Sequence, residues 1–83
     1  MNNLNIRFDI EYDNVSYNIE VDQFYYSDYK GLLVHFWIDY SGFWLTIIDN
    51  RFEIEGYNWN LSQGTIDAIG TKIMKYWNNR AFL

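Results

Sequence analysis

The chain has 83 residues, a net charge of −5 and no cysteine, which together exclude several classes of protein. Without cysteine there is no disulfide, no thiolate nucleophile and no cysteine-ligated zinc site. The negative charge opposes direct binding to nucleic acid, because phosphate contacts require a basic surface. The length predicts a single domain over residues 1–83, and aromatic side chains, 22% of the chain, are its main means of burying surface.

The first strands are predicted by alternation of apolar and polar side chains. Residues 4–12 and 15–21 both have this period of two, which is typical of a half-buried strand. Asp13-Asn14 lies between them, and both residue types tolerate the positive φ of a tight hairpin turn. A two-residue turn there places Arg7 opposite Glu20, so charge supports the register.

A second hairpin follows in residues 34–40 and 43–47, with Ser41-Gly42 as the expected turn. A further turn at Asp49-Asn50 predicts a short fifth strand through residues 52–54. The pairs expected across the second hairpin are Trp37 with Thr46 and Asp39 with Trp44.

The segment between the two hairpins contains Tyr25, Tyr26 and Tyr29. Tyrosine offers a large contact area with only two side-chain torsions, so the segment could be a recognition loop. It could equally continue the second strand and pack across the end of the helix. The sequence leaves both interpretations open.

The period changes to that of a helix from Asn60 onward, with Asn60 or Ser62 as the N-cap. Gly70 lies on or beside the apolar stripe, where a missing side chain lets the helix approach the sheet. The stripe consists of Ile66, Ile69, Ile73 and Trp77. We therefore expect an α+β fold, an antiparallel meander of four to five strands with one C-terminal helix packed on one face.

One helix can cover only part of one sheet face, so the other face is left for function. The face expected to be covered carries Val34, Phe36 and Leu45, with the apolar residues of the first hairpin. Exposed apolar patches commonly mark interfaces, so we expect the uncovered face to bind a second copy or a protein partner. The alternative is that the sheet curls and buries these rings against its own loops. The expected interface comprises Leu33, His35, Trp37, Asp39, Trp44, Thr46 and Ile48.

Two further functions fit the remaining residues. Aromatic walls with a few polar groups suit a small-ligand pocket, either between subunits or beneath the tyrosine segment. Carboxylates on the sheet could also imitate a nucleic-acid backbone and occupy a basic groove of an inhibited protein. The acidic set comprises Asp9, Glu11, Glu20, Asp22, Glu53 and Glu55.

No catalytic constellation, metal site or cofactor motif is expected. His35 is the only histidine, and Asp39, four residues along the same strand, is about 13 Å away and too far to orient it. Alternating carboxylates such as Asp9 and Glu11 are about 7 Å apart, too far to share one ion unaided.

The compartment is inferred from the same composition. The start of the chain shows no signal peptide, and no apolar run approaches the roughly 18 residues of a membrane span. A secreted domain of this size usually has disulfides, so we expect a cytoplasmic protein without a membrane partner. The abundance of asparagine, isoleucine and tyrosine suggests a phage or bacterial accessory protein, and we expect a non-catalytic interaction module.

Overall fold

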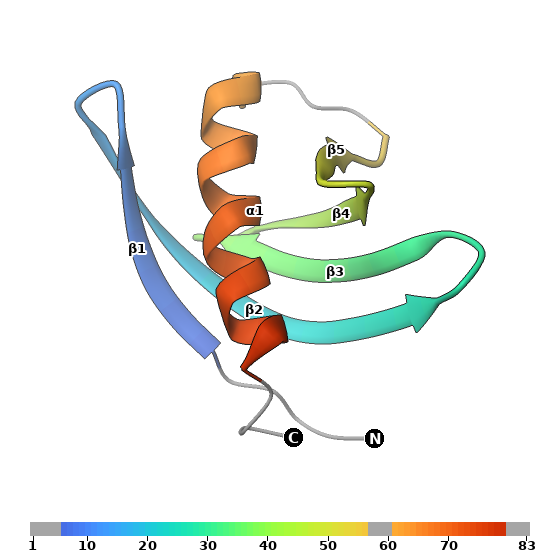
Figure 1. The fold of residues 1–83 in the computed structure, drawn as a ribbon. Coiled ribbons are helices and arrows are strands. Elements are labelled where there is room, and N and C mark those ends of the chain that lie inside the picture. The colour runs from blue at the N-terminus through green and yellow to red at the C-terminus, as the bar shows by residue number, and fades with distance from the viewer. Residues whose placement is uncertain (1–5, 57–60, 80–83) are drawn as a thin grey trace.

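The computed structural model describes residues 6–56 and 61–79 of the chain. The strands form one antiparallel sheet in the order β1-β2-β3-β4-β5, and the sheet curls around a single helix on one side (Figure 1). The expected α+β fold is confirmed. The start of the first predicted strand and the candidate cap Asn60 lie outside the described residues. The elements are β1 (Ile6–Tyr12), β2 (Val15–Ser27), β3 (Gly31–Ile38), β4 (Ser41–Ile48), β5 (Arg51–Ile54) and α1 (Gln63–Asn78).

Two of the hairpin turns are those expected from the sequence. Asp13-Asn14 and Asp49-Asn50 join their strands with φ values of 55° and 65°, and of 52° and 61°. Positive φ at both central residues is what a type I′ turn requires, and its twist matches the twist of the flanking strands. Arg7 pairs with Glu20 across the first turn, as expected.

The turn expected at Ser41-Gly42 is wrong, since β3 and β4 are joined by Asp39-Tyr40 with Asp39 at φ 56°. The turn thus lies two residues earlier than expected, and each β3 residue pairs with a β4 residue four positions before its expected partner. Because side chains alternate with period two, a shift of four leaves the strand side chains on their expected faces, whereas Asp39 moves from the expected strand into the turn. In place of the expected partners, the observed pairs are Trp37 with Gly42, His35 with Trp44 and Leu33 with Thr46.

Packing around Gly42 accounts for the observed register. A Cβ at Gly42 would lie 3.0 Å from His35 Nε2 and 3.3 Å from Trp37 Cζ3, so glycine leaves room for both rings. On the other face, the same register stacks Phe36 on Phe43 with ring centroids 5.4 Å apart. Two contacts between strands thus favour this pairing over the one that the turn residues suggest.

Strand β2 continues to Ser27, so Tyr25 and Tyr26 are strand residues. A β-bulge between Val21 and Gln23 interrupts its pairing with β3. A bulge adds one residue to one strand and thereby switches which positions face the core. Val21 faces the helix before the bulge, and Tyr26 does so after it, where its ring stacks on Trp77 of α1.

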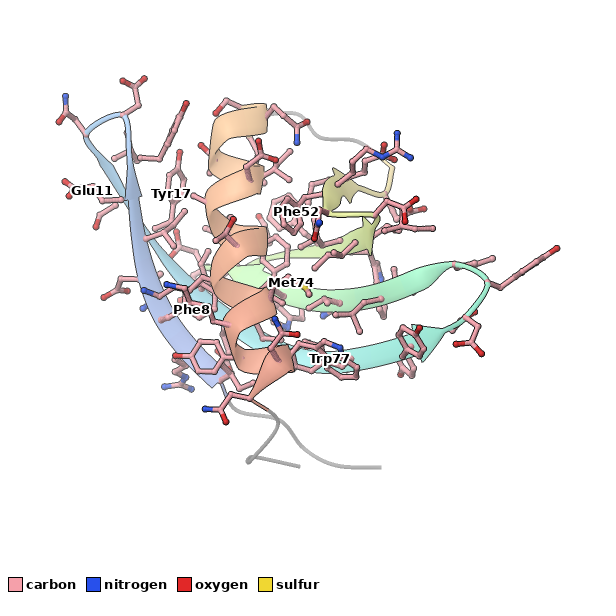
Figure 2. All side chains as sticks on the ribbon, viewed as in Figure 1. Phe8, Glu11, Tyr17, Phe52, Met74 and Trp77 are labelled. Carbon is pink, nitrogen blue, oxygen red and sulfur yellow. The ribbon has the colours of Figure 1, made fainter. Side chains whose placement is uncertain are left out.

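The core lies between α1 and the concave side of the sheet. The predicted stripe is confirmed, because Ile66, Ile69 and Ile73 are at most 1% exposed. Ser62 caps the helix by accepting a hydrogen bond from the Thr65 amide at 3.1 Å. The covered sheet face is the expected one, with Phe8, Ile10, Ile19, Val21, Leu32, Val34, Phe36, Leu45 and Ile47 buried. Figure 2 shows Phe8 and Phe52 pointing toward α1.

Crossing a membrane requires a longer and more apolar helix than any found in residues 6–56 and 61–79.

The contact of α1 with β5 depends on Gly70, where an added Cβ would clash with the ring of Phe52. We expect Gly70→Ala to lower the free energy of unfolding by about 1–2 kcal/mol. Overpacking costs about 1–3 kcal/mol, which outweighs a gain of about 1 kcal/mol in helix propensity. Urea unfolding followed by circular dichroism measures this change.

Gly64→Ala is the matched control in the same helix. Its Cβ would meet the end of the Tyr12 side chain, which is 41% exposed and can turn into water. We therefore expect Gly64→Ala to be neutral or stabilising by up to about 1 kcal/mol. Equal effects of the two substitutions would contradict the proposed role of Gly70.

Candidate functional site

The side of the sheet opposite α1, which we call the outer face, is the candidate functional site. Its central strands carry apolar and aromatic side chains, and its two flanks carry charged ones. The central residues are Tyr25, Leu33, His35, Trp37, Trp44, Thr46 and Ile48. The flanking residues are Arg7, Asp9, Glu11, Glu20, Arg51, Glu53 and Glu55. Figure 2 shows Glu11 of β1 pointing away from α1.

The bulge in β2 places Asp22 between two rings of β3. One carboxylate oxygen lies 2.8 Å from His35 Nδ1, and the other accepts a hydrogen bond of 3.1 Å from Trp37 Nε1. Both bonds hold the carboxylate against the sheet, yet its side chain is still 31% exposed. Asp22 is therefore a fixed negative charge within an aromatic surface.

His35 lies at the centre of a continuous line of rings, which we call the aromatic row (Tyr25, Trp44, His35 and Trp37). Its ring centroid is 4.6 Å from that of Trp44 and 5.2 Å from that of Trp37. Tyr25 extends the row at 6.1 Å from Trp44. Rings at these separations attract one another and hold a common surface.

The aromatic row is partly exposed to solvent. Trp37 is 36% exposed, and the side chain of His35 is 14% exposed. Trp44 is partly buried by its neighbours in the row, among them Tyr25 from the tyrosine segment. The rings thus shield one another in part, and α1 lies on the opposite side of the sheet.

All six residues of the predicted acidic set lie on this face. Some of them have partners, since Arg7 pairs with Glu20 at 3.5 Å and Asn18 donates to Asp9 at 2.8 Å. On the other flank, Thr46 donates a 2.6 Å hydrogen bond to Glu55. The aromatic row therefore has carboxylates on both sides.

A hollow of about 470 Å³ continues the outer face beyond Trp44. Leu33 and Ile48 contribute apolar surface, and Tyr25 forms one wall. Lys30 and Glu55 place opposite charges at its border. The hollow lies beside the tyrosine segment, where the sequence suggested a pocket.

The structure pairs His35 with Asp22, and Asp39 lies in the β3–β4 turn, where it borders a separate hollow of about 410 Å³. The sequence placed Asp22 in the acidic set, but its contacts with His35 and Trp37 were missed because no bulge was expected in the second strand. The signal was present: Val21 and Phe24 are both inward-facing but three positions apart, which indicates an extra residue between them.

The tyrosine segment divides between several surfaces. Tyr25 belongs to the outer face, Tyr26 packs on α1, and Tyr29 lies in the β2–β3 turn with 90% of its surface exposed. The three residues therefore do not form one recognition loop. Across residues 6–56 and 61–79, no three histidine, aspartate or glutamate side chains come together in a way that could hold a metal ion.

We expect Asp22→Ala to disorder the aromatic row, because Trp37 Nε1 and His35 Nδ1 both lose their partner. The expected cost is about 0.5–1.5 kcal/mol of unfolding free energy, with a large shift of the Trp37 indole N–H signal in a ¹H–¹⁵N NMR spectrum. Asp9→Ala is the control, since it also removes an accepting carboxylate of the outer face. We expect it to cost less than about 0.5 kcal/mol. An unchanged indole signal in Asp22→Ala would contradict the assignment.

Comparison with known proteins assigns no function to this surface. No protein-family model matches the chain, and no curated protein or solved structure matches it either. The case for a function therefore rests on the residues of the outer face and on their chemistry.

Proposed function

We propose that this protein is a non-catalytic interaction module whose outer face binds the basic surface of a partner protein. The observation that carries the proposal is the aromatic row with carboxylates on both flanks, on a face that α1 does not cover. An aromatic centre within a polar rim is the common anatomy of protein interfaces. Tryptophan and tyrosine are also the side chains that most often dominate binding energy.

Charge favours a different protein over a second copy. The strands of the outer face carry six carboxylates and two arginines, Arg7 and Arg51. Arg7 is paired with Glu20. Packing this face against itself about a two-fold axis would bring carboxylates together, which costs free energy. A basic partner gains from the same charges. A nucleic-acid-binding protein is one such partner, because the acidic set offers its basic groove a run of negative charge.

Two measurements test this proposal in sequence. The first is light scattering behind size exclusion, for which we expect a monomer of 10.1 kDa at all concentrations. The second is selection of binding peptides from a random library, followed by synthesis and calorimetry of the enriched peptides. We expect these peptides to combine an apolar anchor with lysine or arginine, and their affinity to fall as salt rises.

Two double variants show whether binding uses the outer face. We expect Trp37→Ser with Trp44→Ser to weaken the selected peptides at least tenfold, while circular dichroism shows a retained fold. Tyr29→Ser with Tyr40→Ser is the matched control, since these rings are 90% and 98% exposed outside the outer face. A mass of twice 10.1 kDa would instead mean that self-association uses the face. If the peptides bind the double tryptophan variant with unchanged affinity, the proposal is wrong.

The hollow beside Tyr25 favours a second function, binding of a small amphipathic ligand. Its volume of about 470 Å³ and its mixture of apolar surface with Lys30 and Glu55 resemble small-molecule sites. A thermal-shift screen against metabolites and nucleotides tests this function, because a ligand at 100 times its Kd stabilises the fold by about 2.7 kcal/mol. We expect hits to lose their effect in Leu33→Glu, which fills the hollow with charge. Hits that survive this change would place the ligand elsewhere.

A further inference from the structure

We propose that the outer face recognises an arginine side chain of its partner, with the guanidinium bound to Asp22 and stacked on the aromatic row. This inference rests on the proposed function, because it names the group that a basic partner would present. Three features of Asp22 support it: an unused lone pair on each oxygen, the neighbouring rings, and a charge that no lysine or arginine of the described residues pairs with.

The hydrogen bonds of Asp22 leave room for a forked donor. Each carboxylate oxygen has two lone pairs, and each uses one of them within the protein, toward His35 Nδ1 and Trp37 Nε1. One lone pair therefore remains on each oxygen. Two parallel N–H groups are what a guanidinium offers to a carboxylate, whereas an ammonium is a point charge with no such fork.

The rings beside Asp22 suit a planar cation. Trp37 is 36% exposed next to the carboxylate, and the row continues from it through His35 to Trp44. A guanidinium stacks on an indole face and is attracted by the ring quadrupole, and tryptophan is the best aromatic partner for this contact. The same side chain can thus bind the carboxylate and cover the exposed ring.

Within residues 6–56 and 61–79, the charge of Asp22 is not compensated by a lysine or an arginine. In the described part of the chain, no lysine or arginine forms an ion pair with Asp22, and Arg7 is engaged by Glu20. Glu20 lies opposite Trp37 in the register of β2 and β3, and its carboxylate is the partner of Arg7. At Asp22, an arriving cation therefore meets a carboxylate to which no lysine or arginine of residues 6–56 and 61–79 is paired.

The direct test uses N-acetyl-arginine amide as the probe, followed by the tryptophan indole N–H signals in NMR. We expect saturable shifts of Trp37 and Trp44 with a Kd on the order of 10 mM at low salt. N-acetyl-citrulline amide has nearly the same shape without the charge, and N-acetyl-lysine amide has the charge without the plane. With sodium chloride matched, we expect citrulline to bind at least tenfold and lysine at least threefold more weakly.

Asp22→Asn removes the charge and keeps the local geometry, since the amide oxygen can still accept from Trp37 Nε1 and the NH₂ group can donate to His35 Nδ1. We expect this variant to bind the arginine compound at least fivefold more weakly. Asp9→Asn is the matched control on the same face, and its Kd should change less than twofold. Equal shifts from arginine and citrulline, or equal losses in the two variants, would overturn the inference.

The peptides selected in the earlier experiment separate the two proposals. If they need Trp44 but bind Asp22→Asn as they bind the unmodified protein, the arginine site is wrong and the interaction face stands. If they need neither residue, the interaction face itself fails. Replacing the peptide arginine that contacts Asp22 by lysine should weaken binding of the peptide at least threefold.

Discussion

The fold depends on one apolar contact, between the isoleucines of α1 and the concave side of the sheet. Ile66, Ile69 and Ile73 are at most 1% exposed, and the buried residues of the sheet all lie on the side that faces them. A protein of this size has little apolar surface to spare, so both ends of the long strand β2 must turn their apolar residues toward the helix. The bulge at Asp22 allows this, because it interrupts the alternation of the strand. Val21 faces the helix before the bulge, and the next residue to do so is Phe24, three positions later.

The same bulge gives the outer face its chemistry. An extra residue in β2 has no direct partner in β3, and here that residue is an aspartate held by the rings of His35 and Trp37. One local irregularity therefore serves the core on one side of the sheet and places a charge among aromatic side chains on the other. Bulges often reorient a side chain in this way near functional sites.

Much of the fold could be predicted from the sequence, because alternation and turn residues act locally. The two-residue error at the β3–β4 turn shifted the pairing by four residues, and an even shift keeps the strand side chains on the same faces. The turn itself could not be decided locally: Asp39-Tyr40 competes with Ser41-Gly42, and the outcome depends on how Gly42 accommodates rings from the neighbouring strand. The contact of Asp22 with His35 depends likewise on the bulge, which the sequence shows only as a break in alternation.

The order of the strands has a consequence for how the chain reaches this structure. Each strand pairs with its neighbour in the sequence, and two-residue turns join three of the four pairs, so the sheet closes only short loops. The helix, by contrast, contacts both β1 and β5, at opposite edges of the sheet. Local pairing is the kind of topology associated with rapid folding. The outer face is thus specified by neighbouring hairpins, while the helix supplies the distant contact that holds them together.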